Sequence, residues 1–348
     1  MSAPVHHADA RLLTQALRDP ATVAQLGVAD WTGLITIARA EALMGTLAEQ
    51  VRDQPMPAEV AALLADHREG AAAAQRAALW EAEMCRRSLS PLGIRTILLK
   101  GTAYAAANLA AARGRQIGDL DILVPRARLQ DAEQALITAG WEWVKSDPYD
   151  DNYYRQWMHE LPPLIHRDRD RMIDVHHTIL PLTARTRPDA EAMIADAVPA
   201  GQDTTLYLLS PTDRVCHAVA HFMADGDFQG GLRNLWDIHC LLQEGAADPG
   251  WWRQLEGRAA HHGLLHELHL TARLAARLYG TPVPENWPEA GIFIRLVERR
   301  LLARNGWGQE RCKILRLLFY LRSHLLRMPP MMLARHLWTK WRMSRSAA

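Results

Sequence analysis

Cysteine is scarce in this chain of 348 residues, and no two cysteines form a CxxC pair. The four are Cys85, Cys216, Cys240 and Cys312. Their scatter argues against a disulfide framework or a structural zinc site and suits a reducing compartment. The sequence also lacks a run of about 18 uncharged apolar residues, and no basic segment followed by an apolar one opens it. We therefore expect a cytoplasmic protein without a transmembrane segment or a signal peptide.

Acidic residues are scarce toward the C-terminal end. Residues 291–348 hold 13 Lys or Arg but only two Asp or Glu, whereas the whole chain has a net charge of +1. Basic C-terminal helices of this kind can contact an anionic partner, such as RNA or an anionic membrane surface. Because apolar residues alternate with the arginines, we favour ordinary helix packing, with the arginine stems lying on the core.

Two stretches read as helices, one at each end of the sequence. Residues 1–92 show apolar side chains at helical spacing and an alanine-rich segment of high helix propensity. Ser210 and Pro211 form a helix start, with Asp213 three residues after the N-cap. From there to Ala348 the pattern stays helical, apart from breaks at proline clusters.

The segment between them alternates strand and helix patterns. Strands are expected over 94–100, 119–124 and 141–145, and helices over 101–114 and 126–140. A polar loop over 146–160 leads to a hairpin whose strands end at His166 and run from Met172 to Thr178. The sequence thus predicts an α+β fold. It has an N-terminal helical region (1–92), a core with a small mixed sheet (93–209) and a C-terminal helical domain with a basic tail (210–348).

The run DLDILV places two carboxylates inside a strand. Residues i and i+2 face the same side, so Asp119 and Asp121 present their charges together. Two like charges this close repel unless a cation lies between them, and hard oxygen ligands suit Mg²⁺ or Mn²⁺. Asp174, between Ile173 and Val175 in a later strand, is the candidate third ligand of a two-metal site. His176 shares its face.

Two other groups of residues resemble metal sites in residue type and spacing. Asp168 and Asp170 form a second D-x-D, but they occupy the predicted hairpin turn, where aspartate is favoured for local hydrogen bonds. His217 and His221 lie four apart on one predicted helix face, as in helical phosphohydrolase sites. No HExxH motif or His-Asp dipeptide accompanies them. We favour histidines packed within the helices, with contact to a nucleotide as a second possibility.

A strand, a glycine and a helix start meet at Lys100-Gly101-Thr102. Free N–H groups and the positive end of the helix dipole favour phosphate at such a junction. Thr102 would add a hydroxyl and Lys100 a charge. Arg113 and Arg115, just before the D-x-D strand, are further candidates for phosphate contact, or are simply solvent-facing arginines.

These motifs resemble a known family. The run ILLKGTAYAAANLAAARGRQIGDLDILV, followed by RMIDVHHTI, is similar to the nucleotidyltransferase superfamily of DNA polymerase β type. More narrowly, it resembles an uncharacterised bacterial group with an LKG…DxD…IDxH pattern, and the similarity extends over most of the chain. It implies that Asp119, Asp121 and Asp174 are catalytic metal ligands. Gly-Thr replaces the superfamily's usual Gly-Ser, and its spacing to D-x-D is longer than usual.

The resemblance also implies a nucleotide site and a reaction. Lys100, Gly101, Thr102, Arg115 and His176 would contact the nucleotide. With Mg²⁺ or Mn²⁺, a nucleoside monophosphate would pass from an NTP to an acceptor hydroxyl, releasing pyrophosphate. The resemblance leaves the identity of the acceptor open: a small molecule, a peptide, a protein and an RNA are all compatible with it. The alternative is a catalytically idle nucleotide-binding or adaptor protein that retains the fold, although the presence of all three carboxylates favours activity.

Overall fold

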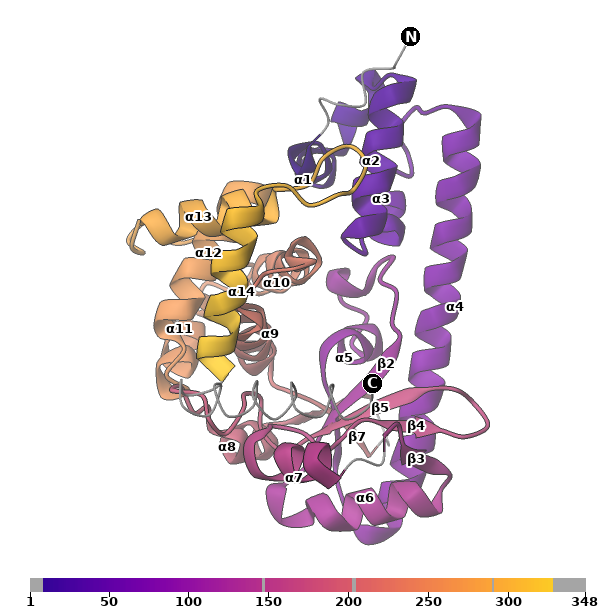
Figure 1. Cartoon of the computed structure of the whole chain (residues 1–348), viewed down its shortest axis with the longest axis vertical. Coiled ribbons are helices and arrows are strands. Elements are labelled where there is room, and N and C mark those ends of the chain that lie inside the picture. The colour runs from indigo at the N-terminus through magenta and orange to yellow at the C-terminus, as the bar shows by residue number, and fades with distance from the viewer. Residues whose placement is uncertain (1–8, 146–147, 202–204, 290, 328–348) are drawn as a thin grey trace, which may run out of the picture.

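The computed structural model describes residues 9–145, 148–201, 205–289 and 291–327. It shows the predicted α+β fold, a mixed sheet flanked by helices (Figure 1). The elements before the D-x-D motif are α1 (Ala10–Arg18), α2 (Val28–Ala40), α3 (Met44–Gln50), α4 (Ala58–Leu89), β1 (Thr96–Leu98) and α5 (Lys100–Ala106). Next come β2 (Asp119–Leu123), α6 (Leu129–Thr138), β3 (Trp141–Trp143), α7 (Pro148–Trp157), β4 (Leu164–His166), β5 (Met172–His176), α8 (Ala190–Ala195), β6 (Val198–Pro199) and β7 (Leu206–Leu208). The C-terminal helices are α9 (Pro211–Asp225), α10 (Gly231–Gly245), α11 (Trp251–His261), α12 (Leu265–Tyr279), α13 (Ile292–Leu301) and α14 (Lys313–Arg327).

The seven strands follow the order β3-β4-β5-β2-β1-β7-β6. The pairs β2–β5 and β1–β7 are parallel, and the other pairs are antiparallel. In the central parallel pair, Asp121 lies opposite Asp174, and Leu123 lies opposite His176. This register brings the two acidic motifs together, although more than fifty positions separate them in the sequence.

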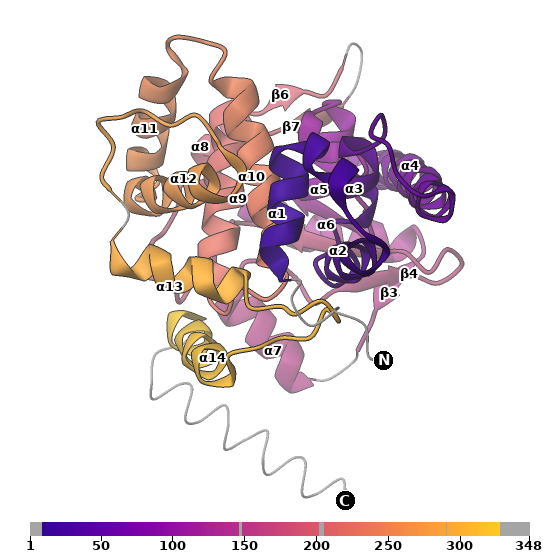
Figure 2. The same ribbon diagram turned by 90° about the horizontal axis from the view of Figure 1, so that it is seen from above.

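Helix α4 runs along one side of the molecule, and the C-terminal helices lie on the other (Figures 1 and 2). Its alanine-rich sequence favours a long helix. Its buried apolar residues follow one face: Leu64, Ala71, Ala78, Ala82, Cys85 and Leu89. This face packs against α3, α5, α6 and the central strands. The helix therefore forms a rigid support behind the strands that carry the aspartates.

The helix predicted over 101–114 is shorter than the sequence indicated. It ends at Ala106 because Asn108 takes a left-handed conformation, with φ +52°. The Leu109 N–H then donates to the Tyr104 carbonyl, a common way to close a helix. Gly114 also has positive φ, and a Cβ there would lie 2.1 Å from the Gly45 carbonyl oxygen. Only glycine fits this contact between α3 and the segment that enters β2.

The predicted loop over 146–160 was also only partly right. Helix α7 forms within it, held by Arg155, which binds Asp151 one turn away and Glu133 of α6. The sequence also did not indicate the short strands β6 and β7. The hairpin and its turn at Asp168–Asp170 are confirmed, and Arg169 of that turn binds Glu81 of α4 at 2.8 Å.

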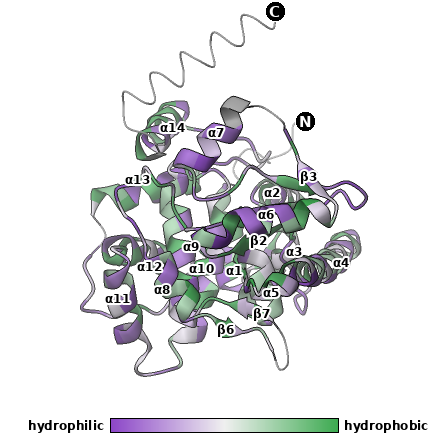
Figure 3. Cartoon of the chain, turned by 90° about the horizontal axis from the view of Figure 1, so that it is seen from below, coloured by the Kyte–Doolittle hydropathy of each residue, from purple (hydrophilic) through white to green (hydrophobic). Residues whose placement is uncertain are grey.

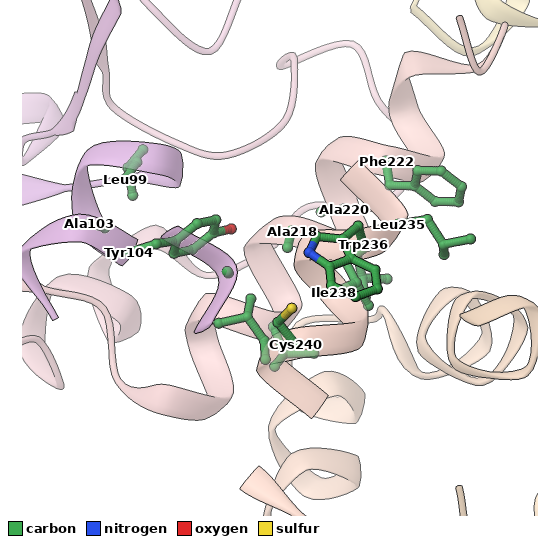
Figure 4. Close-up of a cluster of buried hydrophobic side chains, with 14 of the residues drawn as sticks. Leu99, Ala103, Tyr104, Ala218, Ala220, Phe222, Leu235, Trp236, Ile238 and Cys240 are labelled. Carbon is green, nitrogen blue, oxygen red and sulfur yellow. The ribbon is translucent and has the colours of Figure 1, made fainter. Parts of the chain in front are cut away.

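The C-terminal helices pack against the sheet unit through apolar side chains. Figure 4 shows Leu99 and Tyr104, at the end of β1 and in α5, in one cluster with Ala218 of α9 and Trp236 of α10. The predicted helix start is confirmed, because Ser210 caps α9 by accepting from the Asp213 N–H. Within the described ranges, no helix is both long and apolar enough to cross a membrane.

The basic C-terminal region is described only as far as Arg327. Helix α14 carries exposed apolar side chains together with arginines (Figure 3). The rest of the predicted basic tail, residues 328–348, lies outside the described residues. The boundaries predicted at 92/93 and 209/210 stay a prediction.

Candidate functional site

Three predicted metal ligands meet on adjacent strands. Asp119 and Asp121 project from β2 and Asp174 from β5, and one oxygen of each lies within 4.8 Å of the others. Asp121 is buried, Asp174 is half-buried and Asp119 is exposed. The cluster therefore has its base in the protein core and opens to solvent at Asp119.

Asp121 is held by two basic groups. The Lys100 amino group lies 2.6 Å from Asp121 Oδ1, and His176 Nε2 lies 3.0 Å from the same oxygen. Burial opposes ionisation of this carboxyl, but Lys100 and His176 together hold the pKa of Asp121 well below its ordinary value. Asp121 is thus an anion with a fixed orientation, as expected of a cation ligand.

The environment of Asp174, unlike that of Asp121, disfavours the ionised carboxylate. Asp174 Oδ1 is buried and has no hydrogen-bond partner among the described residues. Burial, together with the charges of Asp121 and Glu160, raises the pKa of Asp174 to about 7. A buried polar atom without a partner is uncommon in folded proteins. A divalent cation between the three carboxylates would supply the missing partner and offset their repulsion, so these residues fit a bound Mg²⁺ or Mn²⁺.

The predicted phosphate-binding residues gather beside this cluster. Lys100 begins α5 with φ +48°, in the left-handed region, and its amino group turns to Asp121. Thr102 is buried, and its hydroxyl has no hydrogen-bond partner in the described ranges. A Cβ at Gly101 would lie 2.7 Å from Arg115 Nε, so the Arg115 side chain lies against the glycine. All four residues therefore occupy one corner of the site.

Arg115 does not point into open solvent. Its guanidinium forms an ion pair with Asp237 of α10, which also pairs with Arg233. The sequence alone did not reveal this link, because Arg115 and Asp237 lie 122 positions apart. The C-terminal helices thus hold one of the predicted nucleotide contacts in place.

A small cavity joins this corner to α9 and α10. Its volume is about 30 Å³, and it is lined by Lys100, Tyr104, Arg115, His217, Ala218, His221, Asn234 and Asp237. Burial and the nearby Lys100 lower the pKa of both histidines, which keeps them neutral at pH 7. Across the residues that the structure describes, neither histidine belongs to a group of three potential metal ligands. Both histidines face the candidate site.

Two further residues lie beside the site that the sequence did not single out. His159 and Glu160 follow α7, within the segment predicted as a loop, and they meet His176. Glu160 bridges to His176 through the backbone, next to the end of β5. The only sequence signal for these two residues was that a histidine and a glutamate are adjacent. Their position beside the site depends on the long-range backbone pairing with His176.

The comparisons with known proteins agree with this geometry. The sequence model of a family described as "uncharacterised nucleotidyltransferase" matches residues 27–280. The match covers more than half of the chain, from just before α2 to just after α12, and includes both strands of the aspartate cluster. No curated protein matches the chain.

Proposed function

The chain belongs to the family of uncharacterised nucleotidyltransferases, and we propose that it transfers a nucleoside monophosphate from an NTP to an acceptor hydroxyl. The observation that carries this proposal is the aspartate cluster of Asp119, Asp121 and Asp174 on adjacent parallel strands. The buried Oδ1 of Asp174, which no described residue hydrogen-bonds, supports a cation at the centre of the cluster.

In this proposal, Asp119, Asp121 and Asp174 hold Mg²⁺ or Mn²⁺. When bound, the ion supplies positive charge that neutralises the triphosphate oxygens. Lys100 keeps Asp121 ionised and adds a second positive charge at the same corner. Gly101, Thr102 and Arg115 complete the proposed nucleotide contacts, and His176, whose Nε2 lies 3.0 Å from Asp121 Oδ1, contributes through that carboxylate.

Asp174 also suits the transfer step. The acceptor oxygen attacks the α-phosphorus, the bond from that phosphorus to the pyrophosphate oxygen breaks, and the acceptor loses a proton. Asp174 is the cluster carboxylate whose Oδ1 accepts no hydrogen bond from the described residues, which leaves this oxygen available to the acceptor's proton. We assign acceptance of the acceptor's proton to Asp174.

The test is transfer of label from each α-labelled NTP, with Mg²⁺ or Mn²⁺, into components of a lysate of the source cells. Asp119→Ala should abolish labelling. Asp168→Ala is the matched control, because it alters the other D-x-D motif, in an exposed turn. Equal labelling by wild type and Asp119→Ala would refute the assignment. Nucleotide binding without transfer to any acceptor would favour the idle adaptor.

An arginine-lined cavity near the C-terminal end offers a place for an anionic partner or acceptor. Its volume is about 450 Å³, and the basic residues in its lining are Arg11, Arg277, Arg295, Arg299, Arg304 and Arg311. Arg277 is paired with Glu298, and Arg304 with Glu41. Arg295, Arg299 and Arg311 have no carboxylate partner among the described side chains. Guanidinium groups left free in this way suit phosphate oxygens, as in an RNA backbone.

A further inference from the structure

Three side chains surround a common point beside the aspartate cluster. His159, Glu160 and His176 each offer one ligand atom, and these atoms lie within 4.8 Å of one another. We propose that they bind a second metal ion, a transition-metal dication such as Zn²⁺, at a site separate from that of the aspartates. These three residues form the His-Glu-His site.

The distances within the His-Glu-His site suit a shared ion better than direct hydrogen bonds. Glu160 Oε2 lies 3.6 Å from His159 Nε2 and 3.5 Å from His176 Nδ1. Hydrogen bonds to oxygen span about 2.7–3.2 Å. Two ligand atoms on a tetrahedral zinc ion, with bonds of about 2.0–2.1 Å, lie roughly 3.3 Å apart. The observed separations are close to the second value.

An unpartnered ring nitrogen points into this site. His176 is 2% exposed, and within the part of the chain that the structure describes its Nδ1 has no hydrogen-bond partner. The other ring nitrogen, Nε2, is already occupied by Asp121 Oδ1 at 3.0 Å. With Nε2 donating to that carboxylate, Nδ1 presents a lone pair toward Glu160, which is also an acceptor. A cation between the two acceptors satisfies both.

The backbone holds the three residues in place. The Leu161 N–H donates to the Val175 carbonyl, and the His177 N–H donates to the His159 carbonyl, both at 2.9 Å. His159 and Glu160 are therefore fixed along the end of β5 by a short antiparallel pairing. Their side chains are 18% and 15% exposed, which leaves the ion a path from solvent.

The donor set selects a different ion from that of the aspartates. Two imidazoles and one carboxylate favour zinc-type ions, whereas three carboxylates favour Mg²⁺. Lys100 lies near four carboxylates, those of Asp119, Asp121, Asp174 and Glu160. Because the negative charges outnumber this lysine, the region accommodates more than one bound cation.

The His-Glu-His site would also position the aspartate cluster. A histidine that binds metal commonly donates its other N–H to a carboxylate, which fixes the ring orientation. Here that carboxylate is Asp121. An ion on Nδ1 of His176 thus fixes the imidazole that orients Asp121, and His159 and Glu160 act as positioning residues for the neighbouring site.

The test measures zinc uptake by the full-length protein without nucleotide. Metal-stripped protein is dialysed against Zn²⁺ in excess Mg²⁺, and the bound zinc is determined by metal analysis. Co²⁺ as a substitute gives a visible absorption band whose intensity reports the coordination geometry of the bound ion. We expect one tightly bound equivalent for wild type and for Asp119→Ala. His159→Ala and Glu160→Gln should weaken binding by more than the roughly 10–100-fold that loss of an outer-shell partner costs.

His261→Ala is the control, since it removes an exposed histidine that pairs with Asp189. It should keep the full equivalent. Glu160→Gln preserves size, and circular dichroism verifies that each variant is folded. Three outcomes would overturn the inference: no zinc uptake by wild type, full uptake by folded Glu160→Gln, or loss of the ion in Asp119→Ala alone. None of these measurements depends on whether nucleotide is transferred.

Discussion

The amino group of Lys100 lies 2.6 Å from Asp121 Oδ1, in an ion pair whose carboxylate is almost fully buried. The sequence suggested phosphate as the partner of this lysine. In the structure, its amino group pairs with one of the proposed cation ligands. The proposed ion and the lysine therefore stabilise the same anion, and the effect of one depends on the other.

Lys100→Met should make stability depend on Mg²⁺. Removing one partner of a buried ion pair leaves an uncompensated charge and costs about 3 kcal/mol. Because Mg²⁺ at the aspartate cluster would replace part of the lost positive charge, it should raise the free energy of unfolding more in the variant than in wild type. Urea unfolding with and without Mg²⁺ measures both values. An equal response to Mg²⁺ in the two proteins would place the cation away from Asp121.

Asp174→Asn should separate stability from activity. Burial and neighbouring carboxylates disfavour the charge on Asp174, so the neutral amide should leave the metal-free protein at least as stable as wild type. The same change removes a proposed cation ligand and should abolish label transfer. Thermal unfolding in EDTA, paired with the transfer assay, tests this. A large loss of stability in EDTA would mean that the carboxylate has a structural role.

The local motifs were predictable from sequence, but their mutual arrangement was not. Alternation within DLDILV and the apolar neighbours of Asp174 indicated that these carboxylates lie on strands of one sheet. That β2 and β5 are parallel neighbours, with Asp121 opposite Asp174, depends on the sheet order. The pairing of Arg115 with Asp237 depends on how α10 packs. Neither contact has a local sequence signal.

Loop assignments failed where tertiary contacts decide the structure. The segment over 146–160 is polar and favours a loop, yet contacts from Arg155 to Asp151 and Glu133 stabilise α7 there. His159 and Glu160 gained importance only through the pairing of their backbone with β5. The end of α5, by contrast, has a local sequence signal in Asn108, because asparagine adopts the left-handed conformation more readily than most residues.

Asp213 should be a main contributor to stability in the C-terminal helices. This fully buried carboxylate accepts hydrogen bonds from Ser210, Arg258 and His262. Asp213→Ala would leave Arg258 without its main partner and should cost about 3–5 kcal/mol. Asp196→Ala removes an exposed partner of the same arginine and should cost under about 1 kcal/mol. Equal losses in the two variants, measured by urea unfolding, would contradict the prediction.

The pKa of Asp213 also predicts how the stability of the protein depends on pH. Burial opposes ionisation, but His262, Arg258 and Ser210 lower the pKa of Asp213 to about 2. Its contribution is therefore fully present above the unfolded-state pKa of about 3.9 and is lost as the pH falls through about 2. Wild type should lose more stability than Asp213→Ala between pH 4 and 2. Parallel curves for the two proteins would show that the acid sensitivity arises elsewhere.

The arginine-lined cavity predicts salt-dependent binding of single-stranded RNA. Arg295 and Arg299 are exposed and have no carboxylate partner within the described part of the chain. Changing both to serine should weaken binding and reduce the slope of log K against log salt by roughly 0.7 for each phosphate that the protein no longer neutralises. The matched control changes Arg39 and Arg76 to serine; these are also exposed and have no carboxylate partner among the described residues, but they lie outside the cavity. Fluorescence anisotropy of a labelled oligonucleotide at several salt concentrations gives both slopes. If the slope falls equally in the two double variants, the RNA is attracted by overall charge and not by this cavity.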